Sequence, residues 1–336
     1  MPRKRGCLGG LLALVIVCAI GAAAIGAYWY LGPYKGFRTE AFVDVEHGMT
    51  TRQIARLLTH RGVVRSEWAF LTVRMLHPHA KLQAGEYRFA TAQTPFQVFD
   101  KIRRGQIFYE EVTVPEGSNM FDIAGLLDQL DMVQGADFLK AAARPAMIHD
   151  LDPIAPSLEG YLFPSTYRMT RSTTPEQLCR AMTDEFRKKW RTLAAPQGTD
   201  VHKIVTLASL VEKETAIPQE RPIVASVFLN RLRLNMPLQC DPSTVYAALL
   251  DNRYRGVIHR SDLASVNPYN TYAHAGLPPG PIANPGMHSL TAALHPATGD
   301  YLYFVAKPDG SGTHHFSATL AEHEKAVLAY RQKQAR

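Results

Sequence analysis

The chain begins with a short basic cluster followed by a long apolar run. Basic residues at positions 3–5 precede a segment without charged residues that lasts until Lys35, and within it residues 7–31 are almost wholly apolar. As a helix, this run would be about 37 Å long, enough to cross a bilayer with some tilt. Trp29 and Tyr30 lie at its far end, where amphipathic rings favour the lipid–water interface. The pattern predicts a transmembrane helix over residues 7–31.

Two other interpretations share this start. A cleaved signal peptide also has a basic cluster, but its apolar core is shorter, and the small triplet at 22–24 lies inside the run rather than after it. A lipoprotein signal around Cys18 is disfavoured because bulky Val17 precedes the cysteine where a small residue is expected. For an uncleaved anchor, the basic cluster predicts that residues 1–6 are cytoplasmic and that the rest of the chain lies outside.

Residues 38–112 have the pattern of a small module. Alternating and helical periodicities predict, in order, a strand at 42–45, helices at 51–61 and 67–76, a strand at 85–89 and a helix at 95–103. The order strand, helix, helix, strand resembles a LysM-type module, a small fold often associated with peptidoglycan. The alternative is a spacer that holds the rest of the chain away from the membrane.

Residues 113–336 are interpreted as one larger domain, because no low-complexity linker interrupts them. The predicted elements are helices at 119–130, 174–193, 201–215 and 222–234, a proline- and glycine-rich loop at 267–286, a strand at 301–306 and a helix at 320–331. The predicted fold class is therefore α+β: an N-terminal transmembrane helix, a small LysM-like module and a larger mixed α+β domain that carries the chemistry.

Composition and charge narrow the function. The chain of 336 residues is 46% hydrophobic and 20% charged, as in an ordinary globular protein. Of the net charge of +7, the basic cluster supplies three charges, and the rest is spread without the dense Lys/Arg stripe of a nucleic-acid binder. A mild positive excess suits an anionic polymer or a membrane surface.

Cysteines and motifs predict no metal site and no cofactor. Cys7 and Cys18 fall in or beside the apolar run, so only Cys179 and Cys240 reach the exterior, either as a disulfide or as two free thiols. No CxxC pair or His/Cys cluster is present. The sequence also lacks HExxH, a phosphate-binding loop and a GxSxG elbow.

Two candidate catalytic carboxylates lie in the segment 201–222. Its apolar residues recur at helical spacing and define one buried stripe. Glu212 and Glu214 flank this stripe on opposite sides, each roughly 80° from its centre at about 100° per residue. Periodicity therefore leaves both candidates open, and a Glu-Lys-Glu run on a helix is most often a solvated face.

The end of this helix favours Glu214. Pro218 disfavours helical backbone at the residue before it, so the helix is expected to end near Thr215. Glu214 then lies in the last turn, at the negative end of the helix dipole, where the pKa of a carboxyl is raised. Partial burial raises this pKa further. A general acid must be protonated near neutral pH, so Glu214 is the better-placed candidate.

The chain resembles the endolytic murein transglycosylase (YceG-like) family in several long motifs that occur in the family's order. They are GEYRF at 85–89, SLEGYLFPSTY at 157–167, LASLVEKET at 207–215, VASVFLNRL at 224–232, LQCDP at 238–242, PYNTY at 268–272, GLPPGPIANP at 276–285 and YLYFVA at 301–306. The likeness covers nearly the whole chain. Cys240 and His315 are small departures that leave the core of the pattern intact.

The resemblance implies a reaction. Such enzymes cut the β-1,4 bond between N-acetylmuramic acid and N-acetylglucosamine within a glycan strand and leave a 1,6-anhydro end. One carboxyl group can serve as both acid and base, so the second carboxylate of an inverting hydrolase is not required. The family's catalytic glutamate falls in the EKET tetrad, which assigns Glu214 as general acid and base and Glu212 as runner-up or support.

The other motifs are expected to supply sugar contacts around the acid. The candidates are Glu159, Tyr161, Asn230, Gln239, Asp241, Tyr246, Tyr269, Asn270 and Tyr272. Each has a structural alternative: Glu159 and Tyr161 fit a turn with buried aromatics, and Asn230 can satisfy backbone groups. Asp241 before Pro242 has the pattern of a helix N-cap.

By resemblance, the substrate is nascent peptidoglycan near the inner membrane, and the catalytic domain is periplasmic. Peptidoglycan synthases are the implied partners, with the enzyme ending glycan elongation. Two alternatives remain open: a muramidase-type hydrolase in which Asp241 activates water, and a non-catalytic scaffold that binds peptidoglycan. A scaffold would tolerate loss of Glu214 but not deletion of residues 38–112.

Overall fold

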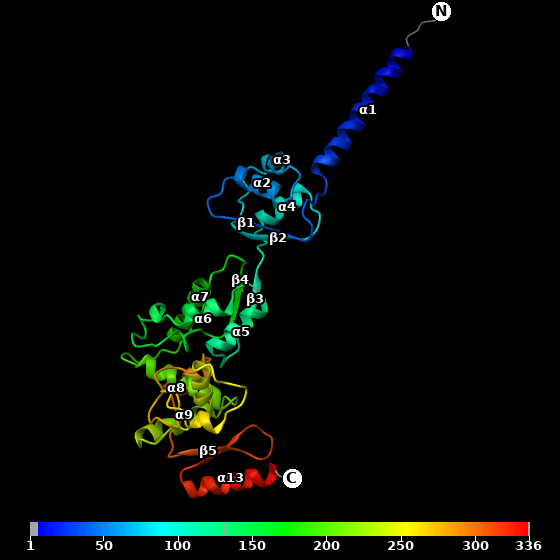
Figure 1. The fold of residues 1–336 in the computed structure, drawn as a ribbon. Helices are drawn as coiled ribbons and strands as arrows, with labels where there is room; N and C mark the ends of the chain where they lie inside the picture. The colour runs from blue at the N-terminus through cyan, green and yellow to red at the C-terminus, as the bar shows by residue number, and fades with distance from the viewer. Residues whose placement is uncertain (1–5, 131, 335–336) are drawn as a thin grey trace, which may run out of the picture. The chain divides into compact units, whose positions relative to one another are not determined.

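The structure is a computed structural model that describes residues 6–130 and 132–334. The chain divides into two compact units, Met1–Tyr109 and Glu110–Arg336 (Figure 1). The basic cluster at residues 3–5, on which the expected orientation of the anchor depends, lies outside the described residues.

The apolar run forms one long helix, α1 (Gly6–Leu31). Between Leu12 and Leu31 this helix is long and apolar enough to cross a membrane, and its side chains there are almost all exposed. At its end, the guanidinium of Arg65 lies 4.1 Å from the centre of the Trp29 ring, which joins the helix to the rest of its unit. The sequence prediction of an apolar helix at this position is confirmed.

The first unit has the predicted order strand, helix, helix, strand. Its elements after α1 are β1 (Ala41–Val45), α2 (Thr51–His60), α3 (Glu67–Leu76), β2 (Gly85–Phe89) and α4 (Pro95–Arg103). β1 pairs with β2 in antiparallel register, with Val43 opposite Tyr87 and both buried. Capping boxes at Thr50 and Thr94 begin α2 and α4, which explains why these helices start where they do.

The second unit combines many helices with two antiparallel strand pairs. Its strands are β3 (Glu110–Thr113), β4 (Thr166–Met169), β5 (Tyr303–Ala306) and β6 (His314–Ser317), and its helices are α5 (Met120–Leu130), α6 (Gly135–Ala142), α7 (Pro175–Thr192), α8 (Val201–Glu214), α9 (Arg221–Arg233), α10 (Asp241–Leu250), α11 (Arg260–Leu263), α12 (Met287–Leu294) and α13 (Leu320–Gln334), with a short 3₁₀ turn at Pro145–Met147. β3 pairs with β4 and β5 pairs with β6. The mixed α+β character is confirmed.

α8 is the central helix of this unit. Every residue from Val205 to Val211 is buried, and the helix packs against α9, α10 and α12. The sequence predicted a single buried stripe, but the small polar residues Thr206 and Ser209 lie inside as well, because their hydroxyls are short enough to be covered. Only the ends of α8 can therefore present functional groups to solvent.

Candidate active site

The carboxylate of Glu212 is fully engaged in holding helices together. Its Oε1 accepts a hydrogen bond from Nη2 of Arg221 at 2.9 Å, and its Oε2 accepts one from the backbone N–H of Gly286 at 2.9 Å. The Glu212 and Arg221 side chains are only 5% and 7% exposed. This buried ion pair joins α8 to α9 and to the start of α12, and each Glu212 oxygen accepts a hydrogen bond from the protein.

Glu214 has a different environment. It is the last residue of α8 and is half-buried, followed by Thr215 in extended conformation. Burial raises the pKa of its carboxyl, and the nearby charge of Asp241 raises it further. A hydrogen bond from the Cys240 thiol and the charges of His314 and Arg231 oppose this, but the net shift is upward. Glu214 therefore keeps its proton to a higher pH than an ordinary glutamate.

The loop and helix beside the acid are tied to each other. Oγ1 of Thr271 accepts the backbone N–H of Cys240 at 2.9 Å and lies 2.8 Å from Oγ of Ser243. Gln239, whose side chain is exposed, has φ +51° and donates its backbone N–H to the carbonyl of Thr271 at 3.2 Å. A non-glycine residue in this left-handed region is uncommon and is held there by its surroundings. The result is a fixed position for the Cys240 thiol next to Glu214.

Asp241 and Tyr272 form a pair at the exposed side of this cluster. The hydroxyl of Tyr272 donates to Oδ1 of Asp241 at 2.5 Å. Burial raises the pKa of the Tyr272 hydroxyl, and its bond to Asp241 adds to this, so the phenol stays a donor. The sequence indicated Asp241 as the N-cap of α10, but the N-cap is Cys240 and Asp241 is the first residue of the helix. The carboxylate of Asp241 is exposed.

Asn270 supports the loop instead of pointing outward. It is buried, and its Nδ2 donates to the carbonyls of Ser265 at 2.7 Å and Leu263 at 3.0 Å. Its Oδ1 accepts from Oγ1 of Thr244 at 3.1 Å and from the backbone N–H of Tyr272 at 3.1 Å. The amide of Asn270 is therefore satisfied within the fold and fixes the backbone at Tyr272.

Glu159 lies in a buried network of its own. Its Oε2 accepts the backbone N–H of Met120 at 2.9 Å, and its Oε1 accepts Nδ2 of Asn284 at 2.8 Å. Tyr246, also buried, donates its hydroxyl to the same carboxyl, and the ring of Tyr269 lies 5.1 Å from the ring of Tyr246. Burial raises the pKa of Glu159 to about 8. The partners of Glu159 differ from those of Glu214.

Two further candidates have structural contacts. Tyr161 is fully buried and donates its hydroxyl to Asp152. Asn230 donates through Nδ2 to the carbonyls of Gly299 at 2.8 Å and Tyr301 at 3.0 Å, which attaches α9 to the segment before β5. Their functional groups are directed to the protein interior or to backbone, not to Glu214.

Sequence reasoning missed Arg231, the residue after Asn230. Its Nε donates to the carbonyl of Leu302 at 2.7 Å and its Nη1 to the carbonyl of Leu238 at 2.8 Å, so it fixes the segment before β5 against the segment before Cys240. Its positive charge acts on Glu214. It lies within the motif VASVFLNRL, but that motif did not distinguish it from its neighbours.

His314 was also missed. The carboxylate of Glu220 accepts the backbone N–H of His314 at 2.8 Å, and Nδ1 of the imidazole lies 2.7 Å from Oε2 of Glu220. Oγ1 of Thr215, the residue after the acid, lies 3.4 Å from the same Oε2. Glu220 thereby holds the β5–β6 hairpin next to the end of α8. No local sequence pattern distinguishes His314 from the other histidines of the chain.

The two cysteines of the second unit are free thiols. Cys179 and Cys240 are both buried and unpaired. Across the part of the chain that the structure describes, no group of three or more His, Cys, Asp or Glu side chains is arranged to hold a metal ion.

A partly exposed carboxyl with a raised pKa thus lies at the end of the buried helix α8, an arrangement that can support acid–base chemistry. A model of the YceG-like family matches residues 43–329. The chain belongs to the YceG-like family.

Individual relatives agree with this assignment. The endolytic murein transglycosylase of Bacillus subtilis is 34% identical over 331 residues, which covers 93% of this chain and 91% of the relative. A protein of the same name from Streptococcus pneumoniae is 28% identical, and the match covers 86% of this chain but only 58% of that longer protein. The crystal structure of a putative YceG-like protein from Listeria monocytogenes covers 86% of this chain and 99% of its own, with a TM-score of 0.56 and 32% identity.

Proposed function

We propose that this protein is an endolytic peptidoglycan lytic transglycosylase in which Glu214 is both general acid and general base. The observation that carries the proposal is the contrast within α8: both oxygens of Glu212 are engaged by protein donors, whereas Glu214 is half-buried at the helix end with a raised pKa. Family membership and relatives named endolytic murein transglycosylases support the same reaction.

The reaction needs one proton donor that later takes a proton back. Protonated Glu214 gives its proton to the glycosidic oxygen while the bond from that oxygen to C1 of N-acetylmuramic acid breaks. The resulting carboxylate removes the proton of the C6 hydroxyl of the same sugar while O6 bonds to C1. The products are a free N-acetylglucosamine hydroxyl and a 1,6-anhydro end, no water is consumed, and Glu214 is protonated again.

The neighbours of Glu214 suit both halves of this cycle. Burial favours the protonated acid that is needed first. The Cys240 thiol and the charges of Arg231 and His314 stabilise the carboxylate that exists between the two steps. The exposed carboxylate of Asp241 can stabilise the positive charge that develops on the sugar ring as the bond breaks.

The proposal also includes a location for this site in the cell. α1 serves as a single-pass anchor in the inner membrane, with the N-terminus cytoplasmic and the catalytic unit periplasmic. The unit around β1 and β2 is a LysM-like module that binds glycan, and its strand, helix, helix, strand order supports this. A tethered enzyme acts on nascent strands close to their synthases and ends glycan elongation there.

The test is mass spectrometry of peptidoglycan digested by the full-length protein in detergent, wild type beside Glu214→Gln. Internal fragments with anhydro ends from the wild type alone are expected. Equal products from both proteins would remove Glu214 from the role of acid. A wild type that yields no products, while its Glu214→Gln variant still supports growth, would favour a non-catalytic scaffold.

The environment of Asp241 supports a second candidate function, that of a muramidase-type hydrolase. Its carboxylate is exposed, interacts with the charge of Glu214 and is held by Tyr272, as a group that activates water would be. This mechanism would give hydrated reducing ends in place of anhydro ends, and Asp241→Asn would abolish it.

A further inference from the structure

Helix α3 of the first unit is apolar on both of its faces. Its inner face, formed by Ala69, Phe70 and Val73, is buried in the core of the unit. Trp68 and Met75 lie seven residues apart on the opposite face, and they are 60% and 68% exposed. A helix at the surface of a globular unit normally carries polar side chains on its outer face. The packing of the unit itself therefore does not account for the outer face of α3.

The exposed apolar surface extends from α3 to the start of α4. Leu76, the last residue of α3, and Phe96 of α4 are both exposed and line the same pocket. Among residues 32–109, all of which the structure describes, the strongly exposed large apolar or aromatic side chains are Trp68, Met75, Leu76, Phe96 and Tyr109. We call the first four the α3 patch. They form one cluster, whereas exposed apolar side chains are usually scattered singly.

α3 begins beside the end of the apolar helix α1. Ser66, the N-cap of α3, donates a hydrogen bond from its Oγ to the hydroxyl oxygen of Tyr30 at 3.1 Å. The guanidinium of Arg65, the residue before it, lies 4.1 Å from the centre of the Trp29 ring and 4.7 Å from the centre of the Tyr34 ring. Aromatic rings at the end of an apolar helix favour the lipid–water interface. The start of α3 therefore contacts the part of the chain that is expected to lie at this interface.

The first unit also carries the positive charge of the chain. Residues 32–109 contain 12 lysines and arginines against 6 aspartates and glutamates, a net charge of +6. Residues 110–336 contain 22 against 24, a net charge of −2. Basic residues close to a bilayer are attracted to anionic phospholipid headgroups. The charge excess and the α3 patch therefore favour the same partner.

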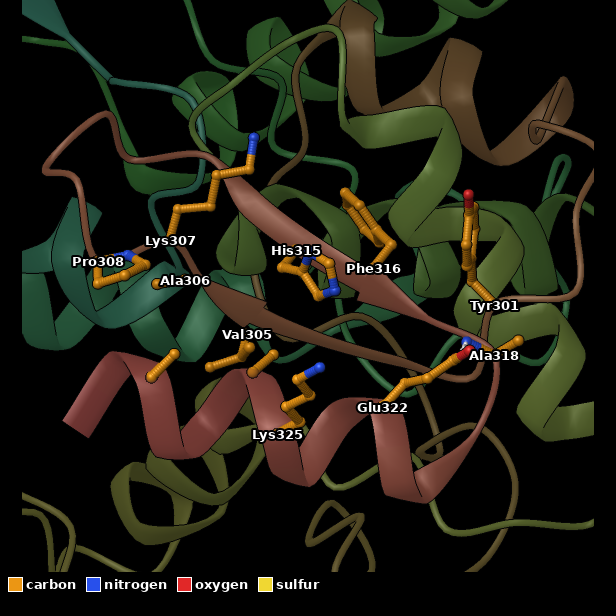
Figure 2. A pocket seen from close by; sticks show the side chains of 12 residues that line it. Tyr301, Val305, Ala306, Lys307, Pro308, His315, Phe316, Ala318, Glu322 and Lys325 are labelled. Atoms are coloured by element: carbon orange, nitrogen blue, oxygen red, sulfur yellow. Dashed lines mark hydrogen bonds between the residues drawn. The ribbon is translucent and has the colours of Figure 1, made fainter. Parts of the chain in front are cut away.

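The second unit offers no comparable surface at its C-terminal pocket. Figure 2 shows this pocket between β5, β6 and α13, lined by apolar side chains and by both signs of charge. Lys325 lies one turn from Glu322 on α13, and Lys307 extends away from that helix. The lining therefore combines apolar surface with mixed charge, in contrast to the first unit.

We propose that the α3 patch inserts into the headgroup region of a membrane that contains anionic phospholipid, an inference that rests on the proposed role of α1 as the membrane anchor. The apolar face of an interfacial helix lies about 5–10 Å into the boundary between headgroups and acyl chains. α3, about 15 Å long, lies along this boundary with Trp68 and Met75 toward the lipid. Attachment through both α1 and α3 limits the rotation of the first unit about the end of its anchor.

The three tryptophans of the chain allow a direct test, because Trp29 lies at the end of α1, Trp68 in the α3 patch and Trp190 in the second unit. Full-length proteins that keep one tryptophan each, with phenylalanine at the other two positions, are reconstituted in bilayers of phosphatidylcholine and phosphatidylglycerol. The acyl chains carry bromine near the headgroup, and bromine quenches tryptophan fluorescence on contact. Trp29 and Trp68 should each lose about half of their fluorescence, since both lie at the headgroup boundary, and Trp190 should lose none.

The test variant keeps Trp68 as its only tryptophan and carries Met75→Ser, Leu76→Ser and Phe96→Ser. Its quenching should fall to less than half of the value without these changes. The matched control Leu328→Ser, at an exposed position of α13, should leave the quenching of Trp68 unchanged. Circular dichroism checks that each protein is folded. If the triple variant does not fold, Met75→Ser alone replaces it, and this exposed substitution should still lower the quenching.

Quenching of Trp29 without quenching of Trp68 would overturn the inference and leave the anchor intact. A change in Trp68 fluorescence on addition of glycan strands would then assign the α3 patch to glycan binding. Undiminished quenching in a folded patch variant would also overturn the inference, because closeness to α1 alone would then hold Trp68 at the bilayer. Absence of Trp29 quenching would refute the proposed anchor. In that case, quenching of Trp68 in the same bilayers still supports the α3 patch, and its absence refutes it.

Discussion

Two regions of the second unit each contain a glutamate whose pKa is raised by burial, and the surroundings of the two carboxyls differ. Around Glu159, the carboxyl is 1% exposed and accepts hydrogen bonds from Met120, Asn284 and Tyr246. At the end of α8, Glu214 is half-buried, with the Cys240 thiol as a donor. A raised pKa therefore identifies a desolvated carboxyl, and in the function proposed above the partly exposed Glu214 is the catalytic one.

Glu212 makes the comparison sharper because it is only two residues from the acid. Its side chain is only 5% exposed, and a guanidinium and a backbone N–H stabilise its negative charge. The three carboxyls thus differ in their surroundings. Glu159 accepts hydrogen bonds from several protein groups, Glu212 forms an ion pair, and Glu214 lies at a partly exposed helix end. Substitution by glutamine, which keeps the shape and removes the charge, distinguishes them.

The largest expected effect is on catalysis by Glu214→Gln. A glutamine cannot give or take the proton, so the rate of strand cleavage should fall by about 10³-fold, equivalent to about 4 kcal/mol of barrier. The midpoint of thermal unfolding should stay within a few degrees of the wild type, since the side chain is half-buried and carries no ion pair. Release of anhydro-ended fragments, quantified by mass spectrometry, measures the rate. A loss below tenfold in a folded variant would contradict the role.

Glu212→Gln should have the opposite profile. The change removes the carboxylate that lies 2.9 Å from the buried guanidinium of Arg221 and leaves only the partly exposed Glu116 at 3.9 Å. Loss of a buried ion-pair partner costs about 3 kcal/mol of unfolding free energy. The comparison is urea unfolding of the full-length protein in detergent, followed by tryptophan fluorescence. Any folded fraction should still cleave strands, because Glu214 is intact. A stable but inactive Glu212→Gln protein would instead show that Glu212 takes part in the reaction.

Hydrophobic periodicity predicted much of the fold. The first unit has local signals, such as Thr50 and Thr94 at helix starts, and Pro218 correctly placed the end of α8. Strand pairing was harder. β3 and β4 are four residues each and lie more than 50 residues apart in the sequence, so no local pattern predicts that these two strands pair.

The site was only partly predictable for a related reason. Two groups that engage Glu212 come from Arg221 and from Gly286, the latter 74 residues away in the sequence. Helix periodicity alone does not indicate which side of α8 Arg221 and Gly286 cover. The family motifs contain residues near Glu214 as well as residues that support the fold. Asp241 and Tyr272 lie near Glu214, whereas Asn270 supports the loop that carries Tyr272.

A third, smaller effect tests the region around Glu159 through pH. Its pKa rises from 4.5 to about 8 on folding, so the folded state binds this proton more tightly than the unfolded state does. This stabilisation is complete below the unfolded pKa, declines as pH rises and is lost as pH passes about 8. Between pH 6 and 7.5 the wild type should lose about 2 kcal/mol more unfolding free energy than Glu159→Gln, which has no such proton.

Urea titrations at several pH values measure this difference, and the contribution of Glu214 cancels because both proteins contain it. Parallel losses in the two proteins would show that Glu159 does not hold a proton in the fold. Cleavage by Glu159→Gln should keep the pH profile of the wild type, because the partners of Glu159 do not include the acid.

The smallest expected effect concerns the Cys240 thiol, whose hydrogen bond lowers the pKa of Glu214 against the effect of burial. Cys240→Ala removes this donor, so the pKa of Glu214 should rise. The acid must be protonated to start the reaction, and the fall of kcat/KM at alkaline pH should therefore move to higher pH. Cys240→Ser, with a stronger donor in the same place, should move it to lower pH. At the pH optimum, both variants should retain activity within about tenfold of the wild type, since one neutral hydrogen bond contributes about 1 kcal/mol. Shifts of the two variants in the same direction would mean that packing, and not the thiol proton, sets the acidity of Glu214.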